Sequence, residues 1–160
     1  MSDSDELRIE IALTPTDDVR LLIGELETTL AAEYPPEQRH GLSLDAIFRP
    51  HVRFFVARRH GAAVACGGVA LFSDYAEVKR MYVRGIARGQ GVADAILARL
   101  EAEVCRAGLS LLRLETGVRQ VAAMRLYVRS GFRECPAFGD YQSMTPQAIA
   151  TSVFYEKRLG

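Results

Sequence analysis

The chain has 160 residues, of which 49% are hydrophobic and 25% are charged, and its 20 basic residues balance 20 acidic ones. These values are typical of one soluble globular domain, here spanning residues 1–160, and the zero net charge gives no reason to expect a nucleic acid or an anionic membrane as partner. No apolar run approaches the roughly 20 residues of a membrane span. The acidic residues 2–6 resemble neither a signal peptide nor a transit peptide, so we expect a cytoplasmic protein.

The three cysteines, Cys66, Cys105 and Cys135, are an odd number without metal-like spacing. This pattern argues against a disulfide framework and against a zinc site. Each cysteine lies in an apolar stretch, as buried free thiols of reducing compartments do. We therefore expect no bound metal.

The first half of the chain predicts two helices and four strands. Residues 7–13 alternate apolar and polar side chains, as a half-buried strand does. Thr16 is placed to cap the first helix, which Pro35-Pro36 ends, and residues 43–48 predict a short second helix. Three further strands are expected at residues 54–58, 62–72 and 77–83, the first two joined by a turn at His60-Gly61.

The second half of the chain alternates helices with strands. A strong helix is expected at residues 91–107, with Gly108 at its end, and another at residues 121–130, closed by Gly131. Strands are expected at residues 111–116, 132–135 and 152–157, and a polar loop at residues 136–146. The resulting order, β-α-α-β-β-β-α-β-α-β-β, predicts an α/β fold with a mixed central β-sheet flanked by helices.

A glycine-rich turn at residues 88–93 follows an expected strand and opens an expected helix. The first N–H groups of a helix have no intrahelical partner and carry the positive end of the helix dipole, so a phosphate fits there. Gly89 and Gly91 let the backbone approach an anion without a Cβ in the way, and Arg88 adds a donor for phosphate oxygens. The turn therefore predicts a pyrophosphate site.

Three other interpretations compete for this turn. A P-loop would end in Gly-Lys-Ser/Thr, which is absent. A dinucleotide fingerprint would need a small third residue where Asp94 stands, although Glu115 lies near the position of that fingerprint's ribose-binding acid. The third interpretation is a purely structural turn in which Asp94 complements the helix dipole.

Two motifs in the expected order resemble the GNAT superfamily of N-acetyltransferases. The acyl-CoA motif of that family, Arg/Gln-x-x-Gly-x-Gly/Ala, is similar to residues 88–93, Arg-Gly-Gln-Gly-Val-Ala, which follow Val83. The second family motif is similar to Ala123-x-x-Leu126-Tyr127-x-x-x-Gly131-Phe132. Shorter stretches at residues 114–117, 139–141 and 154–157 resemble bacterial GNAT proteins of undefined substrate, so the resemblance covers nearly the whole chain. The chain departs from the family at Gly85, where proline is common, and at Gln120, where asparagine is common.

The resemblance implies a single-domain GNAT fold whose fourth and fifth strands splay apart around the pantetheine arm of acetyl-CoA. The acetyl group would pass directly to a primary amine, on a small molecule or on a protein, in a ternary complex. The implied contacts to acetyl-CoA are Met81, Tyr82, Val83, Arg88, Gly89, Gln90, Gly91, Val92 and Ala93.

Two side chains are expected to handle protons. By resemblance, Tyr127 lies near the sulfur, where its phenol can donate to the departing thiolate; the alternative is a packing aromatic. Glu77 is the candidate base for the amine. Strand periodicity places Glu77, Lys79 and Met81 on one face unless a bulge intervenes, so the alternative for Glu77 is a solvated pair with Lys79.

The acceptor and the partners are less constrained by the sequence. Tyr34, His40 and Tyr141 are candidate substrate contacts, in segments that line the acceptor site of GNAT relatives or in a loop able to close over it. Relatives often dimerise through late strands, so a homodimer using residues 152–157 as a sheet edge is one expectation. Two rival functions are a CoA-binding sensor without transferase activity and a nucleotide-dependent oxidoreductase that binds NAD.

Overall fold

Residues 6–160 are described by the computed structural model, and residues 1–5 of the acidic N-terminus lie outside the described part. All eleven expected helices and strands are present in residues 6–160, in the expected order. Three short 3-10 helices lie between them. The elements are β1 (Arg8–Ile11), α1 (Asp17–Glu33), η2 (Pro36–Gln38), α2 (Leu44–Ile47), β2 (Val52–Arg59), β3 (Ala62–Leu71), β4 (Ala76–Val83), η3 (Gly85–Ala87), α3 (Val92–Arg106), β5 (Leu111–Gly117), α4 (Val121–Arg129), β6 (Arg133–Glu134), η4 (Gly139–Ser143) and β7 (Ser152–Arg158).

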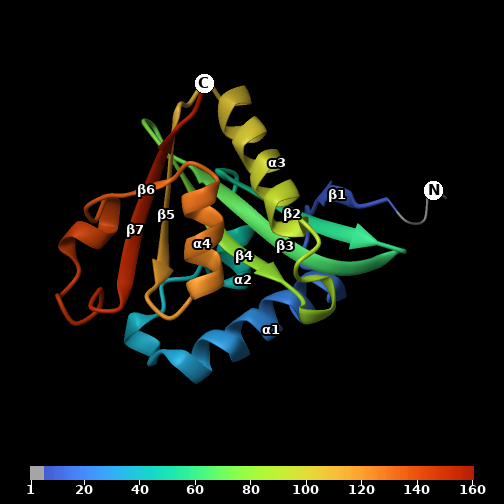
Figure 1. Ribbon diagram of the computed structural model, residues 1–160, viewed down its shortest axis with the longest axis horizontal. Helices are drawn as coiled ribbons and strands as arrows, with labels where there is room; N and C mark the ends of the chain where they lie inside the picture. Colours follow the sequence, from blue (N-terminus) through green and yellow to red (C-terminus); the bar gives the residue numbers. More distant parts are fainter. Residues whose placement is uncertain (1–5) are drawn as a thin grey trace.

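One seven-stranded sheet runs through the molecule in the order β1-β2-β3-β4-β5-β7-β6 (Figure 1). Its strand pairs are antiparallel except β4 with β5, which pair in parallel only at Ala76–Leu112 and Glu77–Arg113. Beyond Glu77 the two strands separate, although β4 continues to Val83 and β5 to Gly117. The expected splay of the fourth and fifth strands is therefore confirmed.

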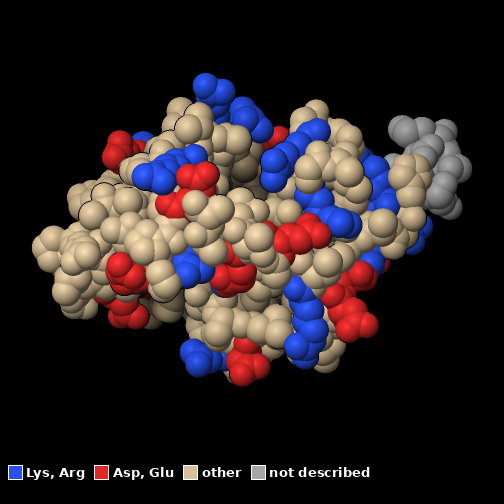
Figure 2. Space-filling model, turned by 90° about the horizontal axis from the view of Figure 1, so that it is seen from below, with Lys and Arg blue, Asp and Glu red and all other residues tan. Residues whose placement is uncertain are grey.

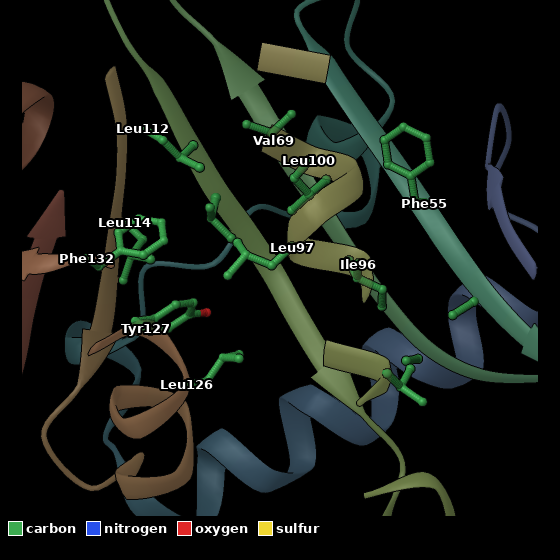
Figure 3. Close-up of a cluster of buried hydrophobic side chains, with 14 of the residues drawn as sticks. Phe55, Val69, Ile96, Leu97, Leu100, Leu112, Leu114, Leu126, Tyr127 and Phe132 are labelled. Atoms are coloured by element: carbon green, nitrogen blue, oxygen red, sulfur yellow. The ribbon is translucent and has the colours of Figure 1, made fainter. Parts of the chain in front are cut away.

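The helices cover both faces of the sheet, and each face has its own apolar cluster. Helices α3 and α4 pack on one face, where Ile96, Leu97 and Leu100 meet Leu112 and Leu114 of β5 (Figure 3). On the other face, α1 and α2 bury the cluster Val19, Leu22, Ile23, Ile47, Phe54 and Val56. The amphipathic spacing of α1 and α3 is thus used as the sequence predicts, with Thr16 Oγ1 accepting from the Val19 N–H at the start of α1.

The C-terminal part of the sheet differs from the sequence-based expectation. Strand β7 is not an edge, because it lies between β5 and the two-residue strand β6. The expected polar loop contains η4, which is held against the sheet because Tyr141 packs with Phe138 and Phe154. Within residues 6–160, no helix is long and apolar enough to cross a membrane.

A β-bulge in β4 corrects the expected strand periodicity. The β3–β4 register shifts between Cys66 and Gly68, and Arg80 adopts a left-handed conformation with φ of 59°. The extra residue turns Met81 toward the α3 cluster, with Ala76 and Val78, whereas Tyr82 packs on the α1 side. Met81 therefore does not share a face with Glu77 and Lys79.

Candidate active site

A cleft of about 850 Å³ opens where β4 and β5 separate. This volume is within the usual range for a small-molecule site. One end is formed by the start of α3 and by α4, and the other by β5, the C-terminal part of α1 and residues 38–41. Acidic and basic side chains alternate over the face shown in Figure 2, consistent with the zero formal net charge.

The glycine-rich turn forms the wall of the cleft at the start of α3. Gly89 and Gly91 have φ values of +74° and +77°, a left-handed conformation that glycine adopts without the strain of a Cβ. Gly91 is the N-cap of α3, and no side chain within residues 6–160 caps the first N–H groups of this helix. A Cβ at either glycine would meet no atom of residues 6–160 within 4 Å. The turn thus presents unpaired N–H donors to an open space, as an anion site requires.

The polar side chains around this turn are partly engaged. Arg88 Nε donates to the Val83 carbonyl at 3.2 Å, while Gln90 bonds to Arg59 and to the Ile86 carbonyl. Asp94 forms an ion pair of 3.1 Å with Arg129 of α4. Because its carboxylate is held by α4, Asp94 leaves the backbone donors of the turn uncovered.

Tyr127 lies on α4 and is buried, with 5% of its surface exposed. Its ring contacts Phe132 and Tyr155, with centroid distances of 5.6 and 6.4 Å. Its hydroxyl points away from Phe132, toward the side on which β4 lies (Figure 3), and the residue lines the cleft. Among residues 6–160 this hydroxyl forms no hydrogen bond. Burial, with the nearby charge of Glu115, raises the pKa of Tyr127, so its hydroxyl stays protonated at neutral pH.

Glu77 is held at the opposite end of the cleft in a buried polar cluster. Its Oε2 atom lies 2.8 Å from Lys79 Nζ and accepts from the Tyr141 hydroxyl at 2.7 Å. Lys79 Nζ also donates to the Tyr141 hydroxyl at 2.9 Å. The Glu77–Lys79 pair considered from the sequence is therefore present. Because Glu77 is only 4% exposed, this pair is buried and not solvated. Burial, together with the charges of Glu77 and Glu115, raises the pKa of Tyr141.

Glu115 is a site residue that the motifs do not predict, because the sequence offers it only as a match to a ribose-binding acid. It projects from β5 into the cleft, and its Oε2 atom accepts from Ser152 Oγ at 2.7 Å. Burial raises the pKa of this carboxyl, an effect partly offset by the Ser152 bond and by the charges of His40 and Lys79. One feature of the sequence could have indicated Glu115: it lies on the expected strand at residues 111–116, which borders the gap between the fourth and fifth strands.

His40 and Tyr34 also line the cleft, through different contacts. The His40 ring packs edge-on against Tyr141 at 5.7 Å, and its Nε2 atom lies 2.8 Å from the Ala148 carbonyl oxygen. The Tyr34 hydroxyl accepts from the Arg119 N–H at 2.9 Å, and a Cβ at position 117 would overlap the Tyr34 ring. Gly117 thus permits α1 to dock against the end of β5, and this docking closes one side of the cleft.

Comparison with known proteins identifies the family. The sequence model of the acetyltransferase (GNAT) family matches residues 21–132. The chain belongs to the GNAT acetyltransferase family. The IAA acetyltransferase of Azospirillum brasilense is 43% identical to this GNAT protein over 145 residues, which cover 89% of this chain and 92% of that protein.

Solved structures agree with this assignment. A Klebsiella pneumoniae protein assigned as an acyl-CoA N-acyltransferase is 32% identical, with a TM-score of 0.76 and coverage of 98% of this chain and 99% of that one. The PaiA N-acetyltransferase of Thermoplasma acidophilum, solved in complex with coenzyme A, shares the fold at 16% identity, with a TM-score of 0.67 and coverage of 94% and 99%. This GNAT protein is therefore an enzyme of the acyltransferase class, related to named N-acetyltransferases.

Proposed function

We propose that the protein transfers an acetyl group from acetyl-CoA directly to a primary amine within a ternary complex. The observation that carries this proposal is a single cleft joining an uncapped helix N-terminus, with two left-handed glycines, to a buried tyrosine and a carboxylate. An anion site and proton-handling groups within one cleft are what acyl transfer from a pyrophosphate-bearing thioester requires.

The donor end fits coenzyme A chemically. The unpaired N–H groups at the start of α3 suit a pyrophosphate, and the exposed Arg88 adds a positive charge beside them. Strand β4 leaves β5 after Glu77, so its later residues border the cleft and not a neighbouring strand on that side. Bound there, acetyl-CoA supplies the thioester whose acetyl group is transferred. We assign its binding to Met81, Tyr82, Val83, Arg88, Gly89, Gln90, Gly91, Val92 and Ala93.

Tyr127 holds a proton at the centre of the cleft and is assigned the role of acid. Its raised pKa keeps the phenol protonated. Its hydroxyl forms no hydrogen bond within residues 6–160, so no such bond has to break before it donates to a ligand. When the amine nitrogen bonds to the carbonyl carbon and the carbon–sulfur bond breaks, this phenol is available to stabilise the departing sulfur. The ring contacts with Phe132 and Tyr155 hold the phenol in place.

Glu77 is assigned the role of base for the incoming amine. Lys79 and Tyr141 both bind its Oε2 atom and fix the orientation of the carboxylate. No hydrogen bond to its Oε1 atom is found within residues 6–160, and the residue lines the cleft. This oxygen is therefore available to accept the proton that the amine must lose before it attacks. His40 and Tyr141 form the wall around the acceptor, and Tyr34 maintains the shape of that wall.

Thiol release from acetyl-CoA in the presence of a panel of amines tests the proposed function. We expect release that depends on both substrates and yields a stoichiometric amount of N-acetylated amine. Calorimetry with coenzyme A and with NAD provides the control for the donor, because the turn should bind only coenzyme A. Binding of coenzyme A without amine-dependent thiol release would contradict the proposal.

A further inference from the structure

The acceptor end of the cleft contains one basic and one acidic side chain that are incompletely paired. Four basic side chains line it, and three of them are paired. Lys79 is paired with Glu77, Arg80 with Glu27 and the Leu42 carbonyl, and Arg119 with Glu33 at 3.6 Å. The fourth, Arg39, is not matched in this way.

Arg39 lies in the segment between η2 and α2, with its side chain 24% exposed. Its Nη1 atom lies 3.9 Å from Glu27 Oε2, and the other oxygen of that carboxylate is already bound by Arg80. The Nε atom of Arg39 is buried and has no hydrogen-bond partner among the described residues. A buried donor without a partner costs free energy, and the planar guanidinium is shaped to bind two oxygens of one anion. Arg39 lines the cleft with a partly exposed guanidinium that forms no hydrogen bond among the described residues, so its terminal nitrogens are available to an anion.

Glu115 shows the opposite imbalance. Its only hydrogen-bond donor among residues 6–160 is the neutral Ser152 hydroxyl, on Oε2, so Oε1 stays unpaired at the cleft wall. Burial without a bonded cation raises its pKa, and a ligand ammonium at this oxygen would offset that desolvation. His40, which follows Arg39 in the chain, is close enough for its charge to act on Glu115. The two unsatisfied groups thus belong to the same end of the cleft.

We infer, building on the proposed acetyl transfer, that the acceptor is a zwitterion whose ammonium group binds at Glu115 and whose carboxylate or phosphonate binds at Arg39. Such a ligand supplies both groups with an opposite charge at once, whereas a plain alkylamine leaves the exposed part of the Arg39 guanidinium without an anion. Arg39 is then the residue that selects anionic amines, and Glu115 is the residue that holds the amine beside Glu77.

A matched substrate series tests this inference. The series consists of ω-amino carboxylates of increasing length, the ω-aminoalkylphosphonates of the same lengths, the methyl esters of the carboxylates, and the plain n-alkylamines. At the best length, we expect kcat/KM for the anionic amine to exceed that for the ester and the alkylamine by about 10- to 100-fold, the value of one charge-assisted hydrogen bond. The carboxylate and phosphonate arms show which anion the site prefers.

Three variants locate the preference. Arg39→Gln should lower kcat/KM for the anionic amine by the same factor, mainly through KM, and leave the alkylamine unchanged; Arg39→Lys should recover part of the loss. Arg106→Gln is the matched control, because Arg106 is exposed on α3, pairs with Glu103 and lies outside the cleft. Melting temperatures of all variants show whether each is folded.

The outcomes separate this inference from the proposed function. Equal or better turnover of alkylamines by the wild-type enzyme would overturn the inference while leaving acetyl transfer intact. A preference for anionic amines that survives Arg39→Gln would overturn the role of Arg39. Calorimetry of the anionic amines without acetyl-CoA provides a second readout: Arg39-dependent binding without any thiol release would refute acetyl transfer and support the zwitterion site.

Discussion

Replacing Gly91 with alanine separates the conformational role of the turn from its role in binding. Gly91 has a φ of +77°, and nothing lies within 4 Å of an added Cβ, so Gly91→Ala meets no steric clash in the free protein. Its stability cost is the left-handed backbone alone, about 1–2 kcal/mol. For a chain of this size that cost corresponds to a decrease in Tm of roughly 2–8 °C.

The same substitution should also weaken coenzyme A binding. The new Cβ would stand beside the unpaired N–H groups at the start of α3, where the pyrophosphate is proposed to bind. Losing one charge-assisted hydrogen bond costs about 1.5–3 kcal/mol, or roughly a 10- to 150-fold increase in Kd. Calorimetric titration with coenzyme A measures this change directly.

Gly108→Ala is the matched control. Gly108 follows the other end of the same helix, with a φ of +80°, and it too has nothing within 4 Å of an added Cβ. The two substitutions should therefore lower Tm by similar amounts, but only Gly91→Ala should weaken coenzyme A binding. An unchanged Kd in Gly91→Ala, or an equal loss of affinity in Gly108→Ala, would refute the assignment of the turn.

Three further predictions concern the cleft. Tyr127→Phe should lower kcat by about 10²-fold or more with little change in coenzyme A affinity; unchanged turnover would remove Tyr127 from the mechanism. Glu77→Gln should lower kcat and flatten the acid limb of the pH–rate profile, and a profile like that of the wild type would exclude Glu77 as the base. For Glu115, burial raises the pKa in the folded state above that in the unfolded state, so the folded state binds the proton more tightly. The contribution of Glu115 to the free energy of unfolding therefore falls as pH rises between these two pKa values. Glu115→Gln should therefore gain stability relative to the wild type as pH rises above the ordinary glutamate pKa of about 4, and a Tm difference that does not change with pH would contradict this reasoning.

The elements could be predicted because their signals are local. The helical spacing of Val19, Leu22 and Ile23 and the Thr16 cap specify α1 within a few turns of chain, and both are observed as expected. The glycine turn is equally local, since Gly89 and Gly91 adopt left-handed conformations on either side of a single residue. The residues assigned to the donor end therefore lie close together in the chain, at 81–83 and 88–93.

The bulge at Arg80 shows where local reasoning ends. Nothing in the alternation of residues 76–83 marks an extra residue, because the bulge exists through pairing with β3 opposite Gly67. A Cβ at position 67 would overlap the Met81 side chain, so the position of Met81 depends on a glycine 14 residues earlier. The bulge is the exception under which Glu77, Lys79 and Met81 were not expected to share a face, and it turns Met81 to the other side of the sheet.

The sequence by itself determined the order of elements, the mixed α/β sheet and the helix N-terminus with its glycine turn, because capping, periodicity and glycine conformation act over a few residues. Only the tertiary structure decided the acceptor end. Glu77 meets Tyr141 across 64 residues of chain, and Glu115 meets Ser152 across 37. Such contacts depend on sheet register and on the burial of η4, and burial sets the pKa shifts of Glu115 and Tyr141. The donor end can therefore be predicted from the sequence. The charged groups proposed to bind the amine can be identified only when the positions of β4, β5 and β7 in the sheet are known.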